Sequence, residues 1–166
     1  MRYIVISDSH GSVRDVQDAI DLAASRGPID GFIHLGDGAA DALASEPYLH
    51  ALFPQAELIA LRGNCDLLCD LPYASELTRS AVKLFLTHGH PYRVKSGLLA
   101  LAYAARERRA QLALYGHTHI ADTRAEHGVT LINPGALCAR CKGRCAYADL
   151  RLREGAFQFE LIPWPD

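Results

Sequence analysis

The sequence lacks a long hydrophobic run. Its longest apolar stretch, residues 98–105, is far shorter than the roughly 20 residues that a transmembrane helix needs. The N-terminal stretch turns polar at Ser7 and does not have the form of a signal peptide. The five cysteines, an odd number, do not fit the disulfide framework of a secreted domain. We therefore expect a cytoplasmic protein without a membrane partner.

An excess of charge of one sign is also missing. The net charge is −2, and no basic stripe marks the chain, so we expect no nucleic-acid partner. No internal repeat, low-complexity tract or linker divides the 166 residues, a length that suits one hydrophobic core. We expect a single domain over residues 1–166. The sequence does not determine the oligomeric state, and a homo-oligomer is compatible with it.

The first half of the chain alternates apolar runs with helical patterns. Strands are predicted at residues 3–6, 31–35 and 57–61. A helix is expected from Val13, with Ser12 as its N-cap and Gly27-Pro28 as its stop, and a weaker helix over residues 47–52. Strands alternating with helices favour βαβ units and a parallel sheet.

The second half is richer in predicted strands. A helix is expected over residues 97–109, and Asn133-Pro134-Gly135 is interpreted as a tight turn. The predicted strands cover residues 74–78, 82–87, 112–115, 120–125, 129–132, 146–152 and 157–162.

Polar residues recur where these strands end. They are Asp8, His10, Asp37, Asn64, His88, His117 and His119. Because the ligand crevice of a parallel sheet lies at the carboxyl ends of its strands, we expect these side chains to lie close together. If the chain stays extended at His117 and His119, both imidazoles point to one side. Such a pair can also be ordinary polar residues, but nitrogen and oxygen donors together favour Mn, Fe, Zn or Ni over Ca.

The order of these motifs resembles that of the calcineurin-like metallophosphoesterases, most closely their small single-domain bacterial and archaeal phosphodiesterase branch. The resemblance covers Met1 to about Pro134 and implies an α-β-β-α sandwich of two mixed sheets flanked by helices. The motifs that carry it are Asp8-Ser9-His10, Gly36-Asp37, Gly63-Asn64-Cys65-Asp66, His88-Gly89-His90, Gly116-His117-Thr118-His119 and Asn133-Pro134-Gly135.

The resemblance also implies two divalent metal ions, Mn²⁺ foremost, and a small phosphate-ester substrate. A hydroxide between the ions would attack phosphorus in line. The ligands implied by motif are Asp8, His10, Asp37 and His119 for one ion, and Asp37, Asn64, His88 and His117 for the other, with Asp37 bridging. The catalytic set implied beside them is Asn64, Asp37, Cys65 and Asp66.

Cys65 departs from the wider superfamily. Many of its phosphatases place a histidine there, and a thiol is a poorer acid than imidazolium at neutral pH. We therefore hypothesise a preference for phosphodiesters with good leaving groups over alkyl monoesters. Asp66 either orients Asn64 or a neighbouring histidine, or caps the backbone. Ala136 also stands where family members often carry a serine.

Other features leave alternatives open. His34 is expected in the core or behind a ligand, and His90 either contacts substrate or has a structural role. The cysteine cluster is either an accessory metal or redox site or an ordinary loop, and its arginines contact a substrate phosphate or solvent. The cluster comprises Cys138, Arg140, Cys141, Arg144 and Cys145. The rival to an enzyme is a non-catalytic metal-binding scaffold of the same fold, which the full ligand set disfavours.

Overall fold

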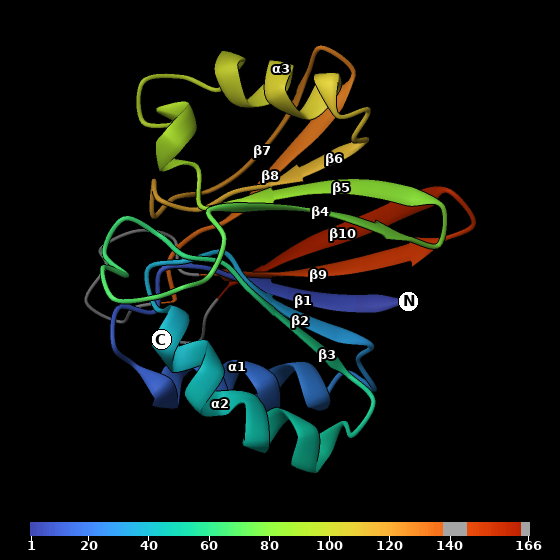
Figure 1. Ribbon diagram of the computed structural model, residues 1–166. Coiled ribbons are helices and arrows are strands. Elements are labelled where there is room, and N and C mark those ends of the chain that lie inside the picture. Colours follow the sequence, from blue (N-terminus) through green and yellow to red (C-terminus); the bar gives the residue numbers. More distant parts are fainter. Residues whose placement is uncertain (138–145, 164–166) are drawn as a thin grey trace.

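The computed structural model describes residues 1–137 and 146–163, which form two facing five-stranded sheets with helices on both outer sides (Figure 1). The first sheet has the strand order β10-β9-β1-β2-β3. Its central strands are parallel, and the two C-terminal strands join antiparallel. The bounds are β1 Arg2–Ile6, β2 Gly31–His34, β3 Glu57–Ala60, β9 Ala146–Arg153 and β10 Ala156–Pro163.

The second sheet also has parallel strands inside, but it carries antiparallel strands at both edges. Its order is β4-β5-β6-β8-β7. Strands β5, β6 and β8 are parallel, whereas β4 and β7 pair antiparallel with their neighbours. The bounds are β4 Ala74–Arg79, β5 Val82–Thr87, β6 Leu112–Leu114, β7 Ala121–Glu126 and β8 Val129–Pro134.

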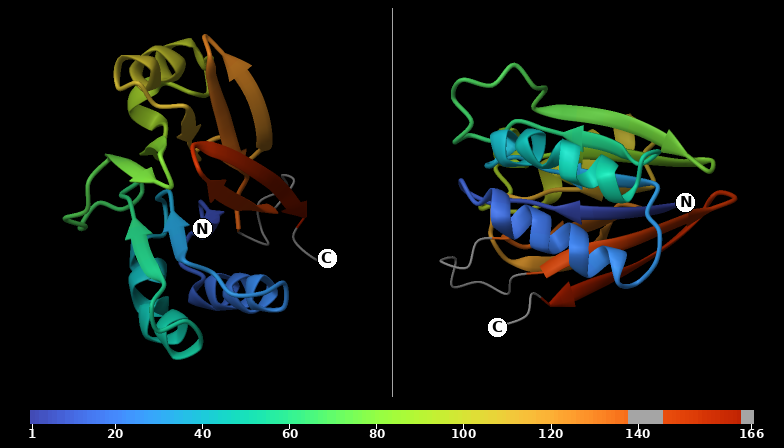
Figure 2. Two further views of the ribbon diagram at one scale, coloured as in Figure 1. Left: turned by 90° about the vertical axis from the view of Figure 1, so that its right-hand side faces the viewer. Right: turned by 90° about the horizontal axis from the view of Figure 1, so that it is seen from below.

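Helices cover the outer faces of both sheets. α1 Val13–Ala24 and α2 Ala39–Leu52 lie side by side on the first sheet, and α3 Leu99–Glu107 lies on the second (Figure 2). On β1, Val5 faces the second sheet while Ile4 and Ile6 pack against the helices. Because both faces of the sheet are covered, the strand is apolar from Tyr3 to Ile6 rather than alternating. The predicted α-β-β-α sandwich is thus confirmed.

Two sequence predictions about helices need correction. The helix expected at residues 47–52 begins at Ala39 and carries Pro47 in its interior. Its amino end has no local side-chain cap, because the cap comes from Asp66, far along the chain. The helix expected over residues 97–109 is shorter at both ends. The Ser12 cap of α1 is confirmed, since its hydroxyl accepts from the Asp15 N–H at 3.3 Å.

Smaller differences lie near the strand ends. Asn133 and Pro134 belong to β8 rather than to a separate turn. A short 3₁₀ helix, η1 His90–Tyr92, follows β5 and was not predicted. The cysteine cluster with Arg140 and Arg144 lies outside the described residues. No helix in the described ranges combines the length and hydropathy needed to cross a membrane.

Candidate metal centre

The predicted ligands lie on loops that follow strands of both sheets, at the edge on the left of Figure 1. Five of them have left-handed backbone: φ is 58° at Asp8, 50° at His10, 54° at Asp37, 69° at His117 and 60° at His119. Residues other than glycine adopt this conformation at a cost, although Asp and His tolerate it better than most. The chain is therefore not extended at the histidine pair, so the condition under which both imidazoles point to one side is not met.

The first group of side chains surrounds Asp8. Its Oδ1 lies 3.1 Å from Nε2 of His119 and 3.8 Å from Nε2 of His10. The two histidine Nε2 atoms are 3.2 Å apart. The Asp8 carboxylate is fully buried, whereas both histidines reach the surface. Asp8, His10 and His119 thus offer one oxygen and two nitrogens within 4.8 Å of one another.

The second group surrounds His88. Its Nε2 lies 3.4 Å from Oδ2 of Asp37 and 3.9 Å from Oδ1 of Asp8. The His117 ring is adjacent, with its centroid 5.1 Å from that of His88. Asp37, His88 and His117 form this group, and Asp37 also belongs to an intermediate group with His10 and Cys65. The turn thus sends His119 to one group and His117 to the other, the same division that the family resemblance implies.

Two buried atoms test whether this arrangement suits a cation. Among the described residues, neither Oδ1 of Asp8 nor Nε2 of His88 has a partner with hydrogen-bond geometry, although Oδ1 lies 3.1 Å from Nε2 of His119. Nδ1 of His88 lies 3.1 Å from the Leu35 carbonyl, which can only accept, so Nδ1 carries the hydrogen. In the neutral form of this ring, Nε2 is a lone pair that faces two carboxylates. Buried acceptors facing one another are costly unless a cation lies between them, so the residues fit metal ions.

The protonation states of His117 and Asp37 agree with this fit, whereas the contact with Asp8 favours the protonated form of His119 in the metal-free protein. Burial lowers the pKa of His117 to about 4, with Lys95 and His88 adding to the shift, so its ring is neutral at pH 7. Burial acts to raise the pKa of Asp37, but hydrogen bonding, including that from the Cys65 N–H, outweighs it and the pKa is lowered. The contact with Asp8 raises the pKa of His119. A neutral imidazole and an ionised carboxylate are the forms that bind metals.

Further side chains hold the ligands in place. Oδ2 of Asp8 accepts from the Ser7 hydroxyl at 2.6 Å and from the His117 N–H at 3.0 Å. The buried Asn133 amide donates to the Gly116 carbonyl and to the Thr118 hydroxyl, both at 3.0 Å. A Cβ on Gly116 would overlap the Ser7 hydroxyl, so the close approach of the two loops requires glycine.

Asp66 has a positioning role rather than a direct place in the centre. Its carboxylate accepts from the N–H groups of Asp37 and Gly63 at 2.8 Å each, and from those of Gly38 and Ala39 at 3.0 and 3.1 Å. Of the two roles considered for Asp66, these contacts match capping of backbone N–H groups. Asp66 both caps α2 and ties the loop after β3 to the loop that carries Asp37.

Asn64 and Cys65 lie on the exposed side of the centre. The Asn64 amide donates to Sγ of Cys65 at 3.3 Å, and its role as a ligand stays a prediction. The Cys65 N–H donates to Oδ1 of Asp37 at 2.7 Å. Partial desolvation and the nearby carboxylates, Asp37 first, raise the pKa of the Cys65 thiol to about 11. A bound cation would act in the opposite direction.

His34 lies behind the ligands, in the core, as expected. The Ser9 hydroxyl donates to Asp41 at 2.6 Å and therefore accepts from Nε2 of His34 at 3.0 Å. Nδ1 of His34 accepts from the Gly36 N–H at 3.1 Å. Burial lowers the pKa of this histidine to about 4. The neutral ring thus joins the loop after β1 to the loop after β2.

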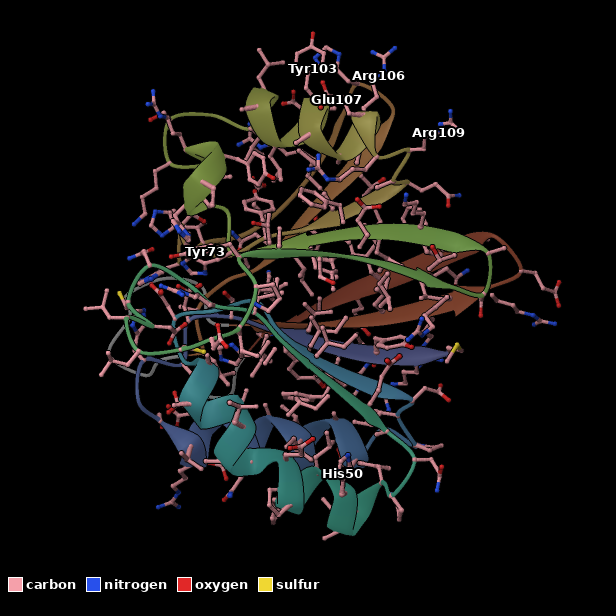
Figure 3. The ribbon with its side chains drawn as sticks, in the orientation of Figure 1. His50, Tyr73, Tyr103, Arg106, Glu107 and Arg109 are labelled. Atoms are coloured by element: carbon pink, nitrogen blue, oxygen red, sulfur yellow. The ribbon has the colours of Figure 1, made fainter. Side chains whose placement is uncertain are left out.

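His90 lies beside the second group. Its ring centroid is 5.4 Å from that of His88 and 5.2 Å from that of Tyr73. Tyr73 in turn contacts Arg62, whose guanidinium lies over the Tyr73 ring, 4.5 Å from its centroid. His50 on α2 is far from the centre, whereas Tyr73 lies at its edge (Figure 3). The structure therefore places His90 next to the ligands without deciding between contact with substrate and support.

Sequence reasoning missed several positioning residues. Ser7, Ser9 and Asn133 act through hydrogen bonds to ligand loops, and Gly63 and Gly116 act through close approach. A signal was available for the serines, since both flank Asp8 at a strand end. Nothing local marks the donated hydrogen bonds of Asn133, because their acceptors lie at least 15 residues away.

Comparison with known proteins agrees with this geometry. The profile of the calcineurin-like phosphoesterase superfamily domain matches residues 1–155. A probable metallophosphoesterase of Bacillus subtilis (strain 168), YsnB, is 33% identical over 94% of this chain and 87% of its own. The phosphodiesterase YfcE of Escherichia coli (strain K12) is 29% identical over 82% of this chain and 79% of its own.

Solved structures share the fold. A conserved protein of Streptococcus pneumoniae TIGR4, described as a predicted phosphoesterase, superposes with a TM-score of 0.75 at 25% identity, over 98% of this chain and 88% of its own. Vps29 of Entamoeba histolytica complexed with Zn²⁺ superposes with a TM-score of 0.71 at 20% identity, over 98% and 99% of the two chains. With the motifs, the geometry and the matched profile together, the chain belongs to the calcineurin-like phosphoesterase superfamily.

Proposed function

We propose that this protein is a metal-dependent phosphodiesterase that binds two divalent ions, Mn²⁺ foremost, and hydrolyses a small phosphate ester. Asp8, His10 and His119 would hold one ion, and His88, His117 and Asn64 the other. Asp37 would serve both, since its carboxylate belongs to two of the three clustered groups. Bound ions would supply Lewis acidity toward the phosphoryl oxygens and lower the pKa of water at the centre.

The residues of the chain then have distinct tasks. The backbone N–H of Cys65 and the carboxylate of Asp66 fix Asp37 from two sides. Ser7 and the His117 N–H fix Asp8 so that Oδ1 faces the histidines. Cys65 lies at the open side, and a thiol is a poorer proton donor at neutral pH than an imidazolium, so the leaving group would depart with little help. This supports the preference for phosphodiesters with good leaving groups.

The observation that carries the proposal is the pair of partnerless buried acceptors. Oδ1 of Asp8 and Nε2 of His88 are 3.9 Å apart in a fully buried setting. A scaffold that used the fold for its surface alone would gain nothing from keeping these atoms unpaired, because apolar or hydrogen-bonded substitutes would stabilise it. The unpaired atoms favour a metal centre, which the proposed enzyme requires, and hydrolysis is what separates the enzyme from a metal-binding scaffold.

The test measures hydrolysis after metal removal and reloading. Protein stripped with chelator should be inactive on an aryl phosphodiester, and Mn²⁺ should restore activity, with Fe²⁺, Zn²⁺ and Ni²⁺ compared in parallel. Aryl diester and alkyl monoester rates should then be compared, with the diester expected to be faster. Inactivity with every ion, on every ester, would leave the scaffold as the better explanation.

A further inference from the structure

A leucine-rich hollow lies beside the metal centre. It has a volume of about 620 Å³ and is lined by the loop from Cys65 to Leu71 together with Ala40 and Leu43 of α2. Leu67 is 78% exposed, Leu68 is fully exposed and Leu43 is 45% exposed. Leucines gathered around a concave surface, rather than scattered singly, are the usual mark of a binding site.

The loop that presents these leucines is held firmly. The Arg62 backbone N–H donates to the Pro72 carbonyl at 3.0 Å, and its guanidinium donates to the Cys69 carbonyl at 2.9 Å. At the other end, the Leu67 N–H donates to the Cys65 carbonyl at 3.1 Å. Asp66 anchors the same end through its four backbone donors. The leucines are thus exposed on a loop whose backbone is already ordered, which lowers the entropic cost of binding.

The hollow borders the metal centre at Cys65. Cys65 lines it, and Sγ of Cys65 lies within 4.8 Å of ligand atoms of His10 and Asp37. A phosphoryl group held at the centre would therefore have one of its substituents directed past Cys65 toward the leucines. The volume lies within the range of about 300–1,000 Å³ that small-molecule pockets occupy.

The charge of the lining limits what can bind. Of the described residues around the hollow, none is cationic, and Asp70 adds a negative charge. A second phosphate or a carboxylate would find no counter-charge there, whereas an uncharged apolar group would bury leucine surface. We infer that the hollow is a specificity subsite for an uncharged, apolar ester substituent of the substrate, an aryl group or an alkyl chain. This inference rests on the proposed function for the position of the phosphoryl group.

The experiment measures binding rather than turnover. Methylphosphonate, butylphosphonate and phenylphosphonate each carry one organic group on a C–P bond that phosphoesterases do not cleave. Their dissociation constants for Mn²⁺-loaded protein are measured by calorimetry. Burial of the larger groups should make butyl- and phenylphosphonate bind about tenfold more tightly than methylphosphonate.

Matched variants assign the effect to the leucines. Leu43→Ser and Leu67→Ser should each reduce the preference for the larger groups to about twofold or less, with methylphosphonate binding unchanged. Leu52→Ser is the control, because Leu52 lies on the same helix as Leu43 with the same 45% exposure but not at the hollow. Activity on an aryl diester is recorded for each protein.

The outcomes separate the two proposals. A preference for large groups that falls in the hollow variants but not in Leu52→Ser supports the subsite, even if no ester is hydrolysed. Equal binding of the three phosphonates, no binding of any, or an unchanged preference in the variants overturns it, and leaves phosphodiesterase activity to stand or fall alone. Sedimentation velocity identifies the other overturning result, a dimer that the leucine variants dissociate while the preference stays unchanged.

Discussion

The two ends of β1 carry buried charged side chains that differ in how fully they are hydrogen-bonded. Arg2, at the start, donates through Nε and Nη2 to Asp149 at 3.1 and 2.8 Å, and through Nη1 to the carbonyls of Ala23 and Gly27 at 3.1 and 2.6 Å. Asp8, just past the end, has hydrogen-bond donors for Oδ2, whereas among the described residues Oδ1 has only the His119 ring at 3.1 Å, without hydrogen-bond geometry. Both side chains are buried.

This difference separates stability from function. A buried charge with all its partners present holds the fold together, and removing one partner is costly. A buried acceptor left without a partner weakens the apo fold and becomes useful only when a cation arrives. The left-handed residues at the Asp8 end add to that cost. The sandwich is thus built to be firm at one end and to depend on a ligand at the other.

The strongest way to sharpen this comparison is to change Asp37. Asp37→Asn keeps the size and the acceptor for the Cys65 N–H but removes the charge shared by two groups. We expect metal-dependent diester hydrolysis to fall by about a thousandfold, equivalent to about 4 kcal/mol. The measurement is kcat/KM at saturating Mn²⁺, with circular dichroism to show that the fold is kept. Activity within a few fold of wild type would contradict the assignment of the centre.

At the start of β1, the substitution Arg2→Met removes the buried ion pair with Asp149. This variant leaves Asp149 buried without its bidentate partner, although Arg26 and Arg151 lie 3.8 and 3.6 Å away and soften the loss. We expect the free energy of unfolding to drop by about 3 kcal/mol, the low end for a broken buried pair. Urea denaturation measures the drop, and kcat/KM of the folded fraction should not change. The double variant Arg2→Met, Asp149→Leu should recover most of the lost stability. If the single and the double variant lose a similar free energy of unfolding, the unpaired Asp149 is not the cause of the loss.

The comparison also shows how far sequence alone reaches. The ring of ligands was predictable, because each of the residues follows an apolar run and the ends of parallel strands converge. The turn at His117 and His119 was not predictable. Both residues have positive φ, and nothing in the sequence Gly116-His117-Thr118-His119 indicates that conformation. The start of α2 was missed for a related reason: its cap, Asp66, is distant in sequence. Local patterns report elements, whereas caps and braces depend on contacts that form after folding.

Metal binding should stabilise the fold from the Asp8 end. Mn²⁺ at a hundred times its dissociation constant should raise the free energy of unfolding by about 2.7 kcal/mol. Thermal and urea unfolding with and without Mn²⁺ measure this gain. The gain should persist in Arg2→Met, because the two ends are independent, and should shrink sharply in Asp37→Asn. An equal gain in wild type and Asp37→Asn would place the bound ion elsewhere on the protein.

His34 offers the finest test, since it is a buried polar group at the metal end with every partner present. Burial lowers its pKa to about 4, against the pull of Asp8, Asp41 and Asp66 and together with the nearby His88. Above pH 6.5 the ring is neutral in both folded and unfolded chains and does not affect stability. As the pH falls, the unfolded chain takes up the proton first, so stability is lost between about pH 6.5 and 4.

For metal-free protein, this linkage predicts that wild type loses about 2 kcal/mol more than His34→Gln between pH 7 and pH 5. Urea denaturation at both pH values measures the difference. The other titrating groups are the same in both proteins, so their contributions cancel when wild type is compared with His34→Gln. Parallel losses in the two proteins would show that His34 takes up its proton at an ordinary pKa, and that its bonds to Ser9 and Gly36 do not fix the neutral ring. A smaller loss in wild type than in the variant would reverse the sign and exclude burial as the dominant cause.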